Sequence, residues 1–271
     1  MSQDNTCPVA IVTGATGGIG STVATRLVEA GYSVMGLGRD QTKLDEMCAN
    51  LHFTKAGWEG FRPPPYPMTA THVDNHMADT AVAVQKAYQD MGERIDLLVC
   101  CHGESPKPMK VLDLDYEEWL RMMMGDVWHS VEACQMVLPY MRDNVGSIVL
   151  LSSFHVTGTY PGRAAYNMAK HAIVGLTQSL CCDYAKYGIN INCIAPGQVD
   201  GPRSQGFVGR AFEDDGKDLM KLWKARAPAG KIVQEDDIAQ TVIWLAKTKA
   251  VNGQTIVIDH GVTASNYYEA F

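Results

Sequence analysis

The 271-residue sequence predicts an α/β protein with an open, doubly wound parallel sheet of about seven strands and helices on both faces. Short apolar runs alternate with segments of helical periodicity along most of the chain. The run at residues 95–101 is apolar apart from Asp96, as is typical of a parallel strand that is covered on both sides. A glycine-rich turn separates the first strand from the first helix. We expect a single domain over residues 1–271.

The alternation places each element in turn. We expect strands at residues 9–12, 33–37, 71–73, 95–101, 147–151, 189–194 and 254–258. We expect helices at residues 21–30, 41–50, 79–91, 115–141, 164–187 and 235–247. Gly31 suits the end of the first helix, and Asp40 suits the cap of the second. The long helix at 115–141 is expected to bend near Gly125.

Two segments depart from this pattern. Residues 51–68 are rich in proline with aromatic residues between, which predicts a loop insertion. This loop is either pinned to the surface by its aromatic residues or serves as a lid or subunit contact. The tail at 264–271 ends in aromatic residues, and such a tail is expected to pack on a neighbouring subunit.

The bulk properties exclude several classes of protein. A net charge of -7 argues against a protein that binds nucleic acid or anionic membranes in a general way. No uncharged apolar run approaches the roughly 20 residues that span a bilayer, and the polar N-terminus lacks a signal pattern. We therefore expect a cytoplasmic protein. The eight cysteines lack the spacing of a disulfide framework or zinc site, so we expect buried, reduced thiols and no metal.

The glycine-rich turn at residues 13–20 indicates a dinucleotide site. It follows a strand and precedes an amphipathic helix, as the phosphate-binding turn requires. Gly14 permits the tight turn, Gly18 lets the backbone approach a pyrophosphate, and Gly20 lets helix and strand pack closely. The N–H groups at the helix start then face the phosphates. A plain strand-to-helix turn is the alternative.

The end of the second strand bears on the choice of cofactor. A carboxylate there holds the adenosine ribose, whereas an arginine favours a 2′-phosphate. Gly38 occupies the expected acidic position and Arg39 follows it, which favours NADP(H) over NAD(H). Asp40 weakens this preference if it turns inward or neutralises Arg39. An exposed loop arginine without a role is a further alternative.

A serine, a tyrosine and a lysine form the candidate catalytic set. Tyr166 and Lys170 lie one turn apart on one helix face. An ammonium beside a phenol stabilises the phenolate and so favours acid–base work at the tyrosine. Ser153 follows a predicted strand, where its hydroxyl can hold the substrate oxygen that Tyr166 protonates.

With these motifs, the sequence resembles the classical short-chain dehydrogenase/reductase family from Val9 to about Thr263. Asp74 and the segments 195–199, 252–254 and 259–261 match further motifs of that family. The resemblance implies a Rossmann-like fold and an NAD(P)-dependent enzyme that interconverts a small-molecule secondary alcohol and a ketone. It also implies a homotetramer or homodimer.

The resemblance assigns roles to residues. Tyr166 is the acid/base, Lys170 activates it and holds the nicotinamide ribose, and Ser153 orients the reacting oxygen. Asp74 contacts the adenine, Val199 contacts the nicotinamide carboxamide, and residues 200–229 form a substrate lid. The expected cofactor site comprises Gly14, Thr16, Gly18, Ile19, Gly20, Arg39, Asp74, Cys100, Gly103, Tyr166, Lys170, Pro196, Gly197 and Val199.

Two departures from the family pattern stand out. Residues 100–103 read Cys-Cys-His-Gly where the family has Asn-Asn-Ala-Gly, so only the glycine is kept. His102 is then either a cofactor contact or a packed loop residue. Asp126 stands where an asparagine completes a proton relay, and it keeps an acceptor oxygen but loses the amide donor. Asp126 supports a water chain to Lys170, marks a weakened relay, or is merely tolerated by the helix.

The substrate region is less informative. We expect a partly aromatic pocket from Phe154, His155 and Tyr160, and we expect Arg203 or Arg210 to bind an anionic substrate group. A catalytically impaired protein that senses dinucleotides or acts as a scaffold is the alternative to an enzyme. A lyase or dehalogenase with the same Ser–Tyr pair is disfavoured by the glycine turn.

Overall fold

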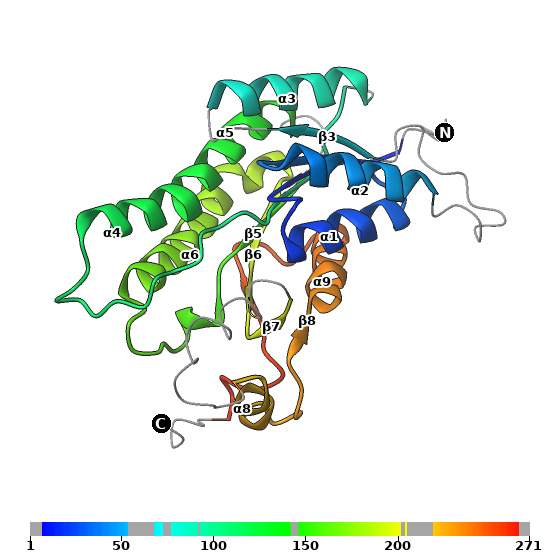
Figure 1. Ribbon diagram of the computed structural model, residues 1–271. Coiled ribbons are helices and arrows are strands. Elements are labelled where there is room, and N and C mark those ends of the chain that lie inside the picture. Colours follow the sequence, from blue (N-terminus) through cyan, green and yellow to red (C-terminus); the bar gives the residue numbers. More distant parts are fainter. Residues whose placement is uncertain are drawn as a thin grey trace.

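Seven parallel strands form the central sheet of the computed structural model, which describes residues 7–53, 68–72, 77–91, 93–141, 146–201, 204 and 219–265 (Figure 1). The strand order is β3-β2-β1-β4-β5-β6-β9. The strands are β1 (Val9–Thr13), β2 (Ser33–Gly38), β3 (Met68–His72), β4 (Leu97–Cys100), β5 (Ser147–Leu151), β6 (Asn190–Pro196) and β9 (Thr255–Ile258). The predicted α/β class and the parallel sheet are confirmed.

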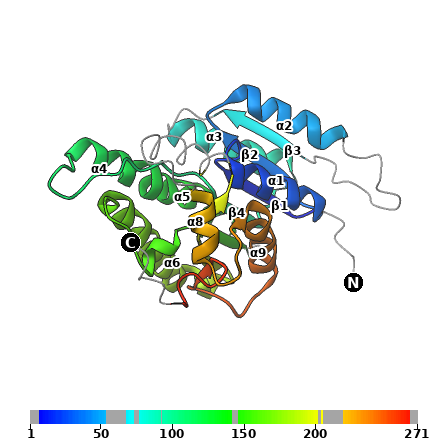
Figure 2. The same ribbon diagram turned by 60° about the horizontal axis from the view of Figure 1, so that its bottom comes forward.

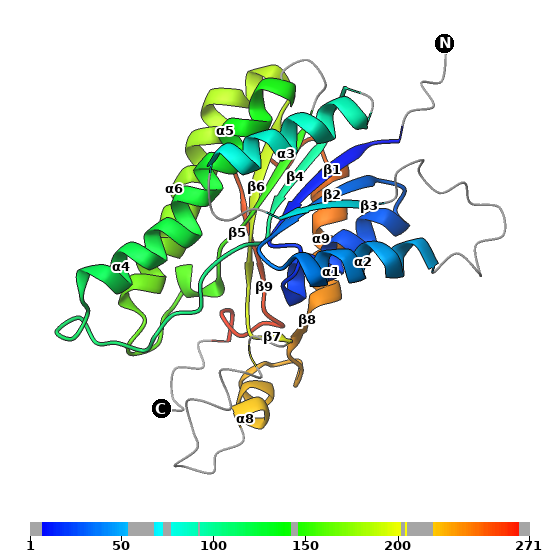
Figure 3. The ribbon, with the colours of Figure 1, turned by 45° about the horizontal axis from the view of Figure 1, so that its top comes forward.

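Helices cover both faces of this sheet (Figure 3). One face carries α1 (Gly18–Glu29), α2 (Gln41–Phe53) and α9 (Glu235–Lys247). The other face carries α3 (Met77–Asp90), α5 (His129–Met141) and α6 (Ala164–Tyr184). Short 3-10 turns η3 (Phe154–Val156) and η4 (Ala185–Tyr187) follow β5 and α6.

A small substructure lies beyond the carboxyl ends of the strands. It contains α8 (Leu219–Arg226) and a separate parallel pair, β7 (Val199–Asp200) and β8 (Val233–Gln234). Figure 2 turns this side of the molecule toward the viewer. The sequence did not predict β7 and β8, because two residues are too few to show a period.

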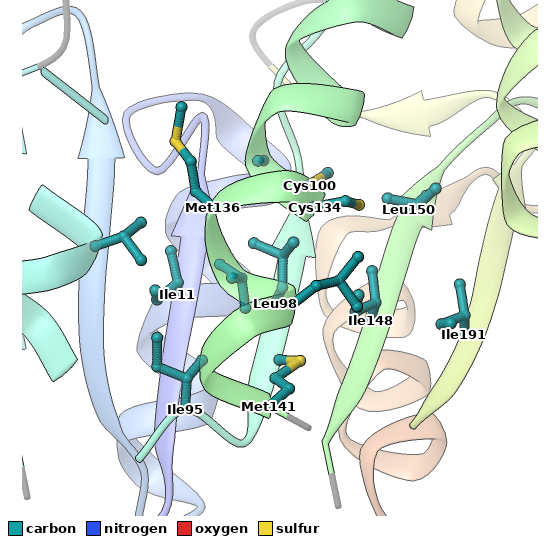
Figure 4. Packing of buried hydrophobic residues seen from close by; sticks show 14 of the residues in the cluster. Ile11, Ile95, Leu98, Cys100, Cys134, Met136, Met141, Ile148, Leu150 and Ile191 are labelled. Atoms are coloured by element: carbon teal, nitrogen blue, oxygen red, sulfur yellow. The ribbon is translucent and has the colours of Figure 1, made fainter. Parts of the chain in front are cut away.

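The apolar strands are buried on both faces, as expected. In β1, Val9 and Ile11 pack with α3, α5 and α6, while Ala10 and Val12 pack with α1 and α9. Figure 4 shows the first of these two layers, with Leu98 of β4 among its side chains. Successive residues of a strand point to opposite faces, so one continuous apolar run serves both layers.

The helix predicted at 115–141 is continuous but irregular. It consists of α4 (Tyr116–Met122), a π-helical turn η2 (Met123–Trp128) and α5. The irregularity includes Gly125, where the sequence predicted a bend. Single π-helical turns are rare and occur often at functional sites.

Several local expectations can be compared with the structure. Gly31 has a φ of 93°, and Asp40 Oδ1 accepts the N–H of Lys43 at 3.1 Å, as the predicted helix ends require. All eight cysteines are free thiols. Three are buried as predicted (Cys100, Cys134 and Cys193), four are only partly buried, and Cys182 on α6 is exposed, so the prediction of burial is wrong for Cys182. Helix α2 extends into the predicted loop insertion as far as Phe53. Residues 54–67 and 266–271 lie outside the described part of the chain.

No helix within the described ranges is long and apolar enough to cross a membrane. The same residues contain no group of three or more histidine, cysteine or acidic side chains that is suited to a metal ion.

Truncating the buried Leu98 tests the importance of the sheet core. We expect Leu98→Ala to lower the free energy of unfolding by about 2–5 kcal/mol, because it removes apolar contacts and leaves a cavity. The matched control is Leu112→Ala, since Leu112 is 98% exposed and Leu98 is fully buried. The control should change stability by no more than about 0.5 kcal/mol. Urea denaturation measures both, and equal losses would contradict this assignment of the core.

Candidate active site

A cleft of about 1580 Å³ lies at the carboxyl ends of the strands. Strands β1 and β4 are neighbours in the sheet although β2 and β3 separate them in the chain, so the chain direction across the sheet reverses between them. Loops leave the sheet in opposite directions at such a point and open a crevice. The predicted site residues that line the cleft are Gly14, Thr16, Gly18, Ile19, Gly20, Arg39, Gly103, Ser153, Tyr166, Lys170, Pro196, Gly197 and Val199.

Two predicted residues lie elsewhere. Asp126 is buried directly behind Lys170. Cys100 points into the core beside Cys134 (Figure 4), and its neighbour Cys101 lines the cleft. Asp74 lies outside the described residues. The roles of Cys100 and Asp74 as cofactor contacts therefore stay predictions.

The glycine turn leaves its backbone open toward the cleft. Gly14 has a φ of +64°, and a Cβ there would lie 2.7 Å from the backbone nitrogen of His102. A Cβ on Gly20 would lie 2.1 Å from the carbonyl oxygen of Gly14. Helix α1 begins here with Gly17 as its N-cap, so no cap side chain accepts the first N–H groups, and the first turn has no acidic residue. These features fit the pyrophosphate of a dinucleotide, because the first N–H groups of a helix attract anions.

One arginine, Arg39, lines the same cleft as the glycine turn. A Cβ on Gly38 would lie 2.9 Å from Cγ2 of Thr16, so the expected position of the acid has no room for a side chain unless Thr16 moves. Arg39 lines the cleft, and its Nη1 lies 3.6 Å from Oε1 of Glu104. Asp40 instead pairs with Lys43, whose Nζ lies 3.3 Å from Oδ2. The Lys43 N–H is the main cause of a lowered pKa at Asp40.

The catalytic candidates meet where β5 ends against α6. Lys170 Nζ lies 5.6 Å from the ring centroid of Tyr166 and donates a hydrogen bond to the Leu151 carbonyl at 3.3 Å. Ser152 Oγ donates to the Lys170 carbonyl at 2.8 Å. Ser153 follows at once and caps η3, where its Oγ accepts the N–H of His155 at 3.4 Å. These bonds fix β5 to α6 and set the serine and the tyrosine in one cleft.

Asp126 forms a buried ion pair with Lys170. The distance from Lys170 Nζ to Asp126 Oδ1 is 3.5 Å, and the two side chains are 5% and 0% exposed. The same oxygen accepts the N–H of Glu104 at 2.9 Å, while Oδ2 has no hydrogen-bond partner. A Cβ on Gly103 would lie 2.5 Å from Oδ1, so the retained glycine makes room for the carboxylate.

His102 connects β1 to the long helix. Its Nδ1 shares a short hydrogen bond with Thr13 Oγ1, and its Nε2 lies 3.1 Å from Ser130 Oγ. Ser130 Oγ in turn donates to the Asp126 carbonyl at 2.8 Å. Burial, aided by nearby cationic groups, lowers the pKa of His102 to about 3, so the ring is neutral at neutral pH. His102 is thus a packed loop histidine that also lines the cleft.

Aromatic side chains line the far half of the cleft. Phe154, His155 and Tyr160 are all present there, as the sequence predicted. The His155 ring meets the rings of Tyr166 and Tyr160 edge-on, at centroid distances of 5.4 and 5.0 Å. Burial, and then the charge of Arg163, lowers the pKa of His155 to about 4. This half therefore offers a largely aromatic surface beside Tyr166, with a neutral imidazole at His155 and the cationic Arg163 and Arg226 among its lining residues.

Several charged cleft residues were not predicted. They are Glu104, Lys107, Arg121, Glu132, Arg163 and Glu235, whereas Arg226, which also lines the cleft, falls within the predicted lid at residues 200–229. No spacing rule connects them, because they come from separate loops and helices that only the fold brings together. Arg203 and Arg210, which were expected to bind a substrate anion, lie outside the described residues.

Comparison with known proteins agrees with this architecture. The sequence model of a family described as "Enoyl-(Acyl carrier protein) reductase" matches residues 14–263. Dehydrogenase/reductase SDR family member 4 of Caenorhabditis elegans is 32% identical over 263 residues, covering 94% of this chain and 95% of the relative. The 2-(R)-hydroxypropyl-CoM dehydrogenase of Xanthobacter autotrophicus is 31% identical over 261 residues, covering 94% of this chain and 98% of the relative.

A solved structure of actinorhodin polyketide ketoreductase with NADPH has a TM-score of 0.84 and 26% identity, and the match covers 98% of this chain and 100% of that chain. The cradle at the glycine turn, the Ser153–Tyr166–Lys170 cleft and these matches over nearly the whole sequence lead to one conclusion. The chain belongs to the classical short-chain dehydrogenase/reductase family, whose members carry out oxidoreduction with a nicotinamide dinucleotide.

Proposed function

We propose that this protein interconverts a secondary alcohol and a ketone, or a related carbonyl, in a single catalytic domain. The observation that carries the proposal is the convergence of Ser153, Tyr166 and Lys170 in the cleft that contains the glycine turn. A nicotinamide dinucleotide bound in this cleft supplies or takes up the hydride. The backbone of the glycine turn and the start of α1 would hold its phosphates.

The chain's own residues manage the proton. In the reductive direction, Ser153 Oγ orients the carbonyl oxygen and the Tyr166 hydroxyl protonates it. The Lys170 ammonium stabilises the phenolate that remains, because the two groups are neighbours on α6. Asp126 holds Lys170 in place, and its second oxygen offers an acceptor for a water that returns the proton.

The cofactor is proposed to be NADP(H) in preference to NAD(H). Two features support this choice. A glycine, Gly38, occupies the position where an acidic side chain would bind the adenosine ribose, and the next residue, Arg39, lines the cleft. Asp40 does not oppose Arg39, because it caps α2 and pairs with Lys43.

The proposal includes a small alcohol or carbonyl as the substrate, a cytoplasmic location and a homotetramer or homodimer. Large apolar side chains are exposed along the helical stretch from α4 to α5, which supports self-association; they include Leu120, Met124 and Trp128. Residues 200–229 are proposed to act as the substrate lid.

The alternative is a dinucleotide sensor that has lost turnover. The departures at residues 100–103 and at Asp126 are the features that favour it. The presence of Ser153, Tyr166 and Lys170 in one cleft favours an enzyme, because a protein that only binds the dinucleotide does not need all three side chains.

Replacing the catalytic tyrosine tests the proposed chemistry. We expect Tyr166→Phe to lower kcat/KM for reduction of a ketone by about 10²–10⁴, because the general acid is lost. The control is Tyr160→Phe, which removes a hydroxyl from the same cleft and should have a much smaller effect. The rates are followed by nicotinamide absorbance, with dinucleotide binding measured in parallel. Equal losses in the two variants would contradict the role of Tyr166.

Replacing Asp126 tests the buried ion pair. In Asp126→Asn the Lys170 charge is no longer balanced, so the phenolate is favoured and the pH at which activity is half-maximal should move lower. Glu132→Gln is the control, because it removes the same charge from another cleft-side residue of the same helical stretch. The control should keep the wild-type profile. An unchanged profile in Asp126→Asn, with the fold intact by thermal melting, would show that Asp126 plays no part in the relay.

A further inference from the structure

An ion pair crosses the cleft above the glycine turn. Arg39 follows β2 and Glu104 follows β4, so the two residues come from strands on either side of β1. Arg39 Nη1 and Glu104 Oε1 are 3.6 Å apart, and both residues line the cleft. The bridge therefore lies over the region where the adenosine half of a dinucleotide is proposed to bind.

Glu104 is held in this position from the other side. Its second oxygen, Oε2, accepts a hydrogen bond from Arg121 Nη1 at 2.7 Å. Arg121 is itself fixed by Glu118, a carboxylate that is 4% exposed, with Nη2 and Oε1 2.7 Å apart. A Cβ on Gly125 would lie 2.4 Å from Cγ of Glu104, so only glycine lets the stem of Glu104 lie here.

Arg39, by contrast, is loosely held. Its side chain is 62% exposed, against 26% for Glu104. An exposed ion pair at this separation contributes little and can be exchanged for a better partner. A phosphate is such a partner, because a guanidinium can donate two parallel hydrogen bonds to it.

We propose that Glu104 competes with the 2′-phosphate of the phosphorylated dinucleotide for Arg39, and so weakens the preference for NADP(H). This rests on the proposed function, since it assumes that the adenosine half binds beside Arg39. To bind the 2′-phosphate, Arg39 must break its ion pair with Glu104, whose carboxylate is held in place by Arg121. Glu104, and not Asp40, is then the acid that moderates the preference for NADP(H).

Two adenosine ligands isolate the 2′-phosphate without any turnover. Adenosine 5′-monophosphate and adenosine 2′,5′-bisphosphate differ in that group alone, and calorimetric titration of the full chain measures both affinities. We expect Glu104→Gln to tighten binding of the bisphosphate by about two- to fivefold, the range typical of an exposed ion pair. The affinity for the monophosphate should not change.

Asp40→Asn is the matched control. It removes one negative charge from the residue next to Arg39, and asparagine remains a good helix cap. We expect wild-type affinities for both ligands. In an Arg39→Ala background, Glu104→Gln should give no gain, because the competed group is absent.

The other outcomes overturn the inference. A gain that persists in the Arg39→Ala background would show that Arg121, released from Glu104, binds the phosphate instead. Weaker monophosphate binding in Glu104→Gln would show that the carboxylate holds the ribose hydroxyls. If the wild type binds both ligands and Glu104→Gln changes neither affinity, the inference fails and the cofactor site stands. If the wild type binds neither ligand, the proposed function fails with it.

Discussion

The buried ion pair between Lys170 and Asp126 is the interaction around which the site is built. Lys170 belongs to α6 and Asp126 to the π-helical turn η2, so the pair joins two elements that lie far apart in the sequence. The Lys170 ammonium also binds the last carbonyl of β5, and the Asp126 carboxylate also binds the N–H of Glu104. Two charges removed from water must satisfy each other and nearby polar groups. These bonds therefore fix α6, η2, the end of β5 and the loop at Glu104 relative to Tyr166.

The parallel sheet explains why these segments meet at all. Every strand of the sheet ends at the same edge, and the reversal of chain direction between β1 and β4 opens that edge into a cleft. Three glycines allow close approaches at this edge that a side chain would block. Gly14 lies against the backbone of His102, Gly20 against the carbonyl of Gly14, and Gly103 against the carboxylate of Asp126. Fold and site therefore depend on the same few close contacts.

Much of this could be predicted from the sequence. The seven strands and the residues of the glycine turn, Ser153, Tyr166 and Lys170 follow from periodicity and fixed spacing, and the structure places these motifs in one cleft. The position of a side chain at a strand end was harder to predict. Strand β4 ends at Cys100, which faces the core, so it is Cys101 that reaches the cleft.

Contacts between distant segments could not be predicted. The sequence left open whether Asp40 neutralises Arg39, and the structure pairs Asp40 with Lys43 and Arg39 with Glu104. No local pattern brings residues 39 and 104 together, because their proximity depends on the strand order. The π-helical turn was equally hidden, since the sequence indicated only a bend near Gly125.

Direct transfer between cofactor and substrate is the central claim, and isotope transfer tests it most directly. Reduced nicotinamide dinucleotide, with and without the 2′-phosphate, would carry deuterium at the transferable C4 position and be incubated with a panel of ketones and aldehydes. Mass spectrometry of the products would then locate the label. The account predicts an alcohol with one deuterium on the former carbonyl carbon. Dinucleotide binding with no labelled alcohol across the panel, and no turnover in the oxidative direction, would contradict it and favour a sensor.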